Sequence, residues 1–158
     1  VREALFNILA SQGAASGSVA DLYAGAGHDG LEALSRGAQQ ALFVDRSRSS
    51  LLAAQENARR VGLEHRCQWV RQDVRTFLRR PPEEAFDLIV LDPPYDMDAG
   101  PPLLTLSRSP LVGDHTVVVV EHEGQQDVAA QGSLEVKQRR RYGRTTLTFL
   151  GRMTPPQA

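Results

Sequence analysis

Cysteine, lysine and long apolar runs are scarce in this sequence of 158 residues. Cys67 is the single cysteine, so no disulfide can form within the chain, and nothing points to an oxidising compartment. No apolar run approaches the roughly 18 residues that a membrane-spanning helix needs, and the first residues lack the basic and apolar parts of a secretion signal. We therefore expect a cytoplasmic protein with no membrane partner.

An excess of charge of one sign is also lacking. The chain carries 18 basic and 19 acidic residues, so there is no overall basic signal for nucleic acid. The four histidines show no metal-ligand spacing, and no metal is expected. The length and the hydrophobic content of 41% suit one domain, which we expect to span residues 1–158 and to be a monomer.

Short apolar strands alternate with amphipathic helices along most of the chain. The periodicity predicts helices over residues 1–11, 31–35, 48–61 and 101–106, and a short one through Phe77 and Leu78. It predicts strands over 18–24, 41–45, 67–70, 88–91 and 116–120. In the third helix, the side chains expected to face inward are Leu51, Leu52, Ala54, Ala58 and Val61.

The tail of the chain has a different pattern. Residues 134–141 and 144–150 alternate with a period of two, and only Tyr142-Gly143 separates them, which predicts an antiparallel hairpin. The alternation before it requires right-handed crossovers and a largely parallel sheet covered on both faces. We expect an α/β fold with a doubly wound, seven-stranded, mostly parallel sheet and an antiparallel C-terminal hairpin.

A glycine-rich turn follows the first predicted strand. Residues 25–30 read Gly-Ala-Gly-His-Asp-Gly and match the pattern G-x-G-x-x-G, and Asp45 ends the next strand, where an acid could bind ribose hydroxyls. A tight structural turn and a dinucleotide site are both compatible with this pattern. A cofactor with one nucleoside fits better, because so short a chain lacks a second nucleotide-binding half. Asp73, after the third strand, suits the exocyclic amine of a purine.

The most specific stretch is Asp92-Pro93-Pro94-Tyr95, directly after the buried strand 88–91. Two successive prolines end the strand and fix a rigid turn. Ligands of open α/β sheets bind outside the carboxyl ends of the strands, so this turn places a carboxylate, a carbonyl oxygen and an aromatic ring at a predicted active site. A plain Pro-Pro turn is the structural alternative.

The sequence resembles a known family at several places. These are residues 1–7 (VREALFN), 21–25 (DLYAG), 30–38 (GLEALSRGA), the Asp92 motif and Tyr142-Gly143. Together they are similar to the RsmD-type bacterial methyltransferases, which modify the N2 amine of a guanine in 16S rRNA of the small ribosomal subunit. The resemblance implies a Rossmann-like class I methyltransferase fold, S-adenosyl-L-methionine as cofactor, and the absence here of the family's basic amino-terminal segment.

The resemblance also assigns site residues. It implies that the cofactor is bound by Asp21, Tyr23, Gly25, Gly27, Asp45, Arg46, Asp73 and Val74, and that the target base is handled by Asp92, Pro93, Pro94 and Tyr95. The family's glycine turn usually reads Gly-Ser-Gly-Ala-Leu-Gly. Ala26 and Asp29 depart from it here, and we interpret Asp29 as a charge that favours the helix start by about 0.3–1 kcal/mol.

A basic segment forms the tip of the predicted hairpin. It comprises Arg139, Arg140, Arg141, Tyr142 and Arg144, which suit contacts with RNA phosphates. A charged edge that prevents strand aggregation is the structural alternative.

Other functions fit parts of the same pattern. The same chemistry could act on adenine N6 or on a protein glutamine. The chain could also be a catalytically inactive RNA-binding module, as the altered glycine turn would allow. A dehydrogenase would instead bind a nicotinamide cofactor.

Overall fold

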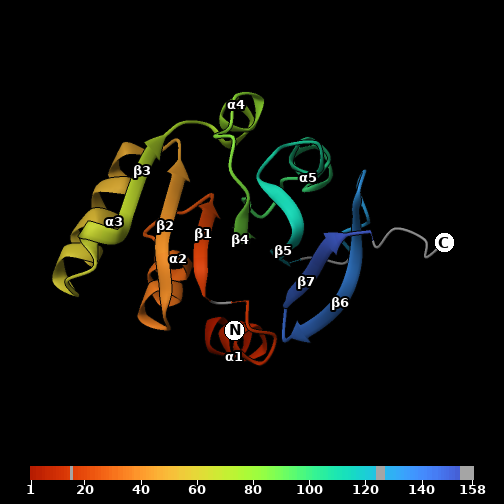
Figure 1. Cartoon of the computed structure of the whole chain (residues 1–158), viewed down its shortest axis with the longest axis horizontal. Coiled ribbons are helices and arrows are strands. Elements are labelled where there is room, and N and C mark those ends of the chain that lie inside the picture. The colour runs from red at the N-terminus through yellow and green to blue at the C-terminus, as the bar shows by residue number, and fades with distance from the viewer. Residues whose placement is uncertain (15, 124–126, 154–158) are drawn as a thin grey trace.

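A single seven-stranded sheet organises the computed structural model, which describes residues 1–14, 16–123 and 127–153 (Figure 1). The strand order is β3-β2-β1-β4-β5-β7-β6. The strands are β1 (Gly17–Leu22), β2 (Ala38–Asp45), β3 (Cys67–Arg71), β4 (Phe86–Leu91), β5 (Val112–Glu123), β6 (Leu134–Tyr142) and β7 (Thr145–Arg152). Strands β1 to β5 pair in parallel, and β7 pairs antiparallel with both β5 and β6. The predicted α/β architecture with its antiparallel C-terminal hairpin is confirmed.

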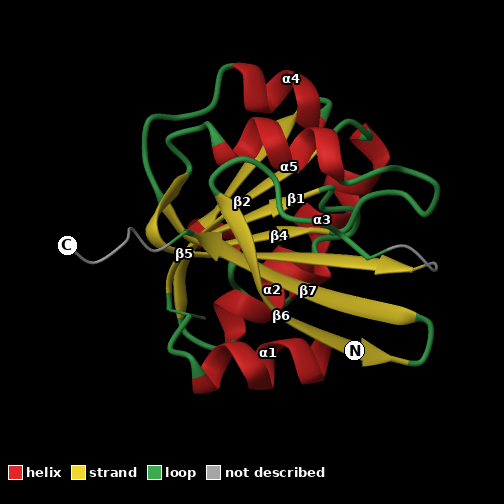
Figure 2. Ribbon diagram, turned by 90° about the vertical axis from the view of Figure 1, so that its right-hand side faces the viewer, coloured by secondary structure: helices red, strands yellow, loops and turns green. Residues whose placement is uncertain are grey.

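Helices cover both faces of this sheet. They are α1 (Arg2–Ser11), α2 (His28–Ser35), α3 (Arg48–Arg60), the one-turn η1 (Glu64–Arg66), α4 (Val74–Arg79) and α5 (Gly100–Ser107). Helices α4 and α5 bury their apolar side chains in one core, and α1, α2 and α3 bury theirs in a second core on the opposite face. Figure 2 shows this layering, with α4 and α5 above the sheet and α1 and α2 below it. None of these described helices is long and apolar enough to cross a membrane.

Several predicted boundaries are wrong in detail. The first strand ends at Leu22, because Tyr23 takes a left-handed φ of 63° that a strand cannot accommodate. Helix α2 begins at His28 inside the glycine turn, three residues before the predicted start. Leu52 of α3 and Val61, directly after the end of this helix, are 52% and 61% exposed and do not face the core. The hairpin turn is Gly143-Arg144 and lies one residue later than predicted.

The glycine turn packs closely against β2, and at Gly30 it leaves no room for a side chain. A Cβ atom built on Gly30 would lie 2.4 Å from the Phe43 ring, and one on Gly27 would lie 3.3 Å from it. Phe43 is fully buried, so its ring has little space to move away. These two glycines therefore fix how closely α2 approaches the sheet.

We expect Gly30→Ala to lower the free energy of unfolding by about 1–3 kcal/mol, as overpacking a core does. Urea denaturation of the purified protein measures this change. The double variant Gly30→Ala, Phe43→Leu should regain part of the loss, because leucine lacks the ring atoms that clash. A Gly30→Ala protein as stable as the parent would contradict this packing.

Candidate active site

The carboxyl ends of four parallel strands meet at one edge of the sheet. Asp92 follows β4 there, and its backbone N–H donates to the carbonyl oxygen of Leu22 at the end of β1 at 3.4 Å. Asp45 ends β2, and Glu121 lies near the end of β5. Asp45 and Asp92, which were predicted as site residues, therefore share one edge of the sheet with Glu121.

A cavity of about 200 Å³ opens on the β1 and β2 side of Asp92. It is lined by Tyr23, Asp45, Arg46, Asp73, Val74, Asp92, Pro94 and Met97. The Tyr23 hydroxyl is buried and has no hydrogen-bond partner among the described residues, so a polar group of a ligand could satisfy it. Apolar walls with a few polar groups are typical of a nucleoside site. We name this cavity the donor pocket.

Two acids of the donor pocket already bind backbone N–H groups. The Asp45 carboxylate accepts from Gly25 and from Ser47, both at 2.8 Å, and so ties the glycine turn to the end of β2. Asp73 caps α4 by accepting from the Arg75 N–H at 2.8 Å. A carboxylate oxygen has a second lone pair, so both acids keep acceptor capacity for ribose hydroxyls or a purine amine. Their contact with a cofactor stays a prediction.

Three of the predicted cofactor residues do not line this cavity. Asp21 is only 2% exposed, and its carboxylate accepts from the Gly30 N–H at 2.9 Å beneath the turn. Gly27 is the left-handed residue before α2, and Gly25 is also left-handed, with open space where a Cβ would point. Asp21 and Gly27 thus shape the turn, whereas Gly25, whose N–H donates to Asp45, leaves open space beside its Cα that a ligand could approach.

A second cavity lies on the β5 side of Asp92. It measures about 240 Å³ and is lined by Asp92, Pro93, Tyr95, Glu121, His122, Glu123 and Thr145. We name it the acceptor pocket. Asp92 lines this pocket and the donor pocket as well, and the Tyr95 side chain is 77% exposed. The Asp-Pro-Pro-Tyr turn therefore forms a wall between two sites.

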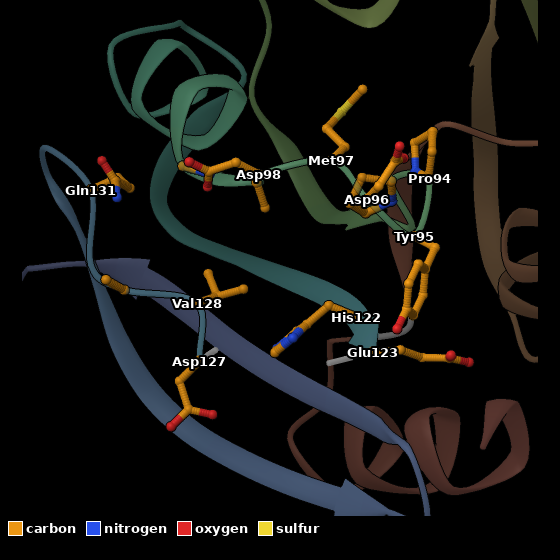
Figure 3. Close-up of a pocket in the computed structure, with 14 residues that line it drawn as sticks. Pro94, Tyr95, Asp96, Met97, Asp98, His122, Glu123, Asp127, Val128 and Gln131 are labelled. Atoms are coloured by element: carbon orange, nitrogen blue, oxygen red, sulfur yellow. The ribbon is translucent and has the colours of Figure 1, made fainter. Parts of the chain in front are cut away.

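A larger open cavity of about 540 Å³ continues from the acceptor pocket towards α5 and residues 127–131 (Figure 3). Tyr95 stands at one end, above Glu123, and the His122 ring points into the cavity towards Val128. His122 Nε2 lies 3.0 Å from the Thr148 hydroxyl, and burial lowers the pKa of the imidazole. A neutral ring and several carboxylates therefore surround the approach to Asp92.

Asp29 and Glu121 lie beside Asp92, with carboxylate oxygens of the three residues within 4.8 Å of one another. Burial and then the charge of Asp29 raise the pKa of Glu121 to about 9, so Glu121 is the group of this pair that holds a proton. Burial raises the pKa of Asp29 as well. Asp29 therefore faces the site. Its interpretation as a charge that favours the start of the helix did not include this position.

The pKa of Asp92 is raised to about 6, by burial first and then by the charges of Asp29 and Glu123. The side chain stays accessible from both pockets while protein surrounds enough of it to disfavour its charge. Such a perturbed carboxyl in a cleft is typical of functional sites.

The basic hairpin tip lies next to the acceptor pocket. Thr145, which lines that pocket, pairs with Glu123 of β5 on one side and with Tyr142 of β6 on the other. None of the four ion pairs found within residues 1–14, 16–123 and 127–153 involves the predicted RNA-binding arginines. Arg139 does donate to the Val128 carbonyl oxygen. The tip thus presents positive charge beside the site.

Glu121, His122 and Glu123 were not predicted as site residues from the sequence. A signal was present, because the acid at position 121 directly follows the apolar run of the fifth strand, as Asp45 and Asp92 follow theirs. The strand was predicted to end at Val120, but it continues through Glu123, so these side chains are wall residues of the site.

A family model described as Conserved hypothetical protein 95 matches residues 1–151. The chain belongs to this family. It is 32% identical over 149 residues to the protein named "Putative rRNA methyltransferase YlbH" of Bacillus subtilis, a match that covers 92% of the chain and 80% of that relative.

Several solved structures share the fold of this chain. A conserved hypothetical protein of Streptococcus pyogenes superposes with a TM-score of 0.85 at 26% identity, over 97% of this chain and 96% of that one. A structure titled "Putative methyltransferase yhhF from Escherichia coli" gives a TM-score of 0.81 over 96% of this chain and 83% of that one, and its 24% identity supports the fold alone. The chain is a methyltransferase of Rossmann-like fold whose methyl donor is S-adenosylmethionine.

Proposed function

We propose that this protein transfers the methyl group of S-adenosylmethionine to the N2 amine of a guanine in 16S rRNA of the small ribosomal subunit. The observation that carries the proposal is the position of Asp92, which lines the donor pocket on one side and the acceptor pocket on the other. A group placed there can hold an amine of the acceptor at the boundary between the two sites.

The donor pocket fits the cofactor by its composition. The Tyr23 hydroxyl, which has no hydrogen-bond partner in the described part of the chain, and the acceptor capacity of Asp45 and Asp73 suit the polar atoms of an adenosine. Val74 and Met97 supply apolar walls. When bound, S-adenosylmethionine supplies an electrophilic methyl group on a sulfonium.

An exocyclic nucleobase amine is a poor nucleophile, because its lone pair is delocalised into the ring. The Asp92 carboxylate and the Pro93 carbonyl oxygen would each accept one N–H of the amine, which favours a tetrahedral nitrogen with its lone pair directed out of the ring plane. The carboxylate also stabilises the positive charge that develops on the nitrogen, and it can take the proton that the nitrogen must lose once the N–C bond has replaced the carbon–sulfur bond of the methyl group. Tyr95 would stack on the base once it has left its helix or loop.

An RNA substrate is supported by the hairpin tip. Arg140, Arg141 and Arg144 bring positive charge next to the acceptor pocket although the whole chain is close to neutral. The similar Bacillus subtilis protein carries an rRNA methyltransferase name. A monomeric state and a cytoplasmic location remain predictions.

The direct test is incubation of the protein with isotope-labelled S-adenosylmethionine and unmethylated small ribosomal subunits or naked 16S rRNA. Nucleosides released by digestion are then identified by mass spectrometry. The proposal predicts label in N2-methylguanosine from 16S rRNA. Label in N6-methyladenosine, in protein glutamine or only in 23S rRNA would contradict it.

The rate of transfer should depend on the charge of Asp92. Because only the ionised carboxylate stabilises the positive charge on the attacked nitrogen, and the pKa of Asp92 is about 6, kcat/KM should fall about tenfold per pH unit below pH 6 and be level above it. Asp29→Leu removes a charge that raises this pKa, so the decline of kcat/KM at acidic pH should begin at a lower pH in this variant. Asp114→Asn is the control. It alters the ion pair with Arg152, which is remote from the site, and should leave the pH dependence of kcat/KM unchanged. The same pH dependence in Asp29→Leu and in the parent would contradict the electrostatic coupling between Asp29 and Asp92.

Neutralising the hairpin tip should weaken RNA binding and its salt dependence. Each of Arg140→Ala, Arg141→Ala and Arg144→Ala should lower the slope of log K against log salt by about 0.7–1 for each phosphate that the removed guanidinium neutralised. Filter binding or fluorescence anisotropy at salt concentrations from about 50 to 200 mM measures the slope. Arg59→Ala is the matched control, because Arg59 lies on α3, next to the opposite edge of the sheet, and pairs with Glu56. Equal slopes for all four variants would show that the tip does not touch RNA.

A further inference from the structure

We infer that Glu123 selects the target base, because its carboxylate accepts the ring N1–H of guanine and opposes bases that present a lone pair there. This inference rests on the proposed function and names the residue of the same site that would distinguish guanine N2 from other nucleobase amines.

Glu123 stands where the reacting edge of the base must lie. It lines the acceptor pocket together with Asp92 and Tyr95, and it also lines the open cavity that leads into that pocket. Figure 3 shows its side chain below the Tyr95 ring. A base stacked on Tyr95 with its amine at Asp92 therefore directs the atoms next to the amine towards the end of β5.

The Glu123 carboxylate is available for such a contact. It takes part in none of the four ion pairs found within residues 1–14, 16–123 and 127–153, and it is exposed to the pocket. Its charge reaches Asp92, where it helps to raise the pKa of that carboxyl. The neighbouring acid of the pocket, Glu121, holds a proton, and Asp92 is assigned to the amine, so Glu123 is the remaining carboxyl group of the pocket wall that can accept the N1–H.

The chemistry of the bases makes this acceptor selective. The N2 amine of guanine is flanked by the N1–H donor and the N3 lone pair. The N6 amine of adenine is flanked on its Watson–Crick side by the bare N1 acceptor, and the N4 amine of cytosine by the bare N3 acceptor. A carboxylate beside the amine pairs with guanine and repels the other two. Sites that read a hydrogen bond in this way reject analogues lacking it far more strongly than apolar sites do.

The test uses an RNA that carries either guanine or 2-aminopurine at the methylated position, once that position has been mapped. 2-Aminopurine keeps the amine but has a bare N1 acceptor and no O6. The parent protein should prefer guanine at least about 100-fold in kcat/KM. In Glu123→Gln the amide can either accept from N1–H or donate to bare N1, so the preference should fall below about tenfold. The missing O6 affects both proteins equally.

Asp127→Asn is the matched control, since Asp127 lines the open cavity but not the acceptor pocket. This variant should prefer guanine over 2-aminopurine as strongly as the parent does. Unchanged affinity for S-adenosylhomocysteine shows that Glu123→Gln is folded. A Glu123→Gln protein that still prefers guanine about 100-fold, while the parent makes N2-methylguanosine, overturns this inference and leaves the proposed function intact. A parent that makes no N2-methylguanosine overturns both.

Discussion

Asp92→Ala should lower kcat for methyl transfer by about 10²–10³-fold or more, the loss seen when one group that stabilises developing charge is removed. The variant loses the carboxylate that lines both the donor and the acceptor pocket and that, in the proposed mechanism, holds the amine at their boundary. Its affinity for S-adenosylhomocysteine should stay close to that of the parent, because Tyr23, Asp45 and Asp73 remain. Radiolabel transfer to rRNA and calorimetric titration measure the two quantities.

Asp92→Asn is the control that separates charge from geometry. The amide keeps one acceptor oxygen in nearly the same place but loses the charge that stabilises the attacked nitrogen, so its rate should lie between those of the parent and Asp92→Ala. Near-normal turnover of Asp92→Ala would show that the residue is not catalytic. Loss of cofactor affinity in that variant would place its role in the donor pocket.

The second large effect concerns Tyr95. Tyr95→Ala should lower kcat/KM by roughly 5- to 150-fold, which corresponds to the roughly 1–3 kcal/mol that an aromatic ring contributes by stacking on a base. Tyr95→Phe should keep most of the activity, because stacking needs the ring and not the hydroxyl. Tyr95 is 77% exposed, so neither change should noticeably alter the midpoint of thermal unfolding.

Steady-state kinetics with the rRNA substrate compare the two Tyr95 variants. Equal losses in Tyr95→Ala and Tyr95→Phe would assign the effect to the hydroxyl. No loss in either would mean that the base does not stack on this ring.

Most of the fold could be predicted because its signals are local. The apolar runs that end at Asp45 and Asp92 identify buried parallel strands, and the period of two after residue 134 identifies the hairpin. Parallel strands point their carboxyl ends the same way, so acids that follow such strands in the sequence share one edge of the sheet. The family resemblance then connected that edge to an amine substrate.

The details that escaped prediction depend on packing between distant segments. Gly30 looks like a ligand-binding glycine in the sequence, but it is required by the Phe43 ring thirteen positions later. Asp29 lies at a helix start, and only the pairing of the strands brings Glu121 to it. The exposure of Leu52 and Val61 likewise depends on where α3 rests on the sheet, which a helical period alone does not fix.

The assignment of the donor pocket is tested most directly by a calorimetric titration of the protein with S-adenosylhomocysteine, with NAD as the control ligand. We predict saturable 1:1 binding of S-adenosylhomocysteine, no binding of NAD, and a weaker complex in Asp73→Ala, because that side chain lines the donor pocket. Absence of saturable binding to S-adenosylhomocysteine, or tighter binding of NAD, would contradict the assignment.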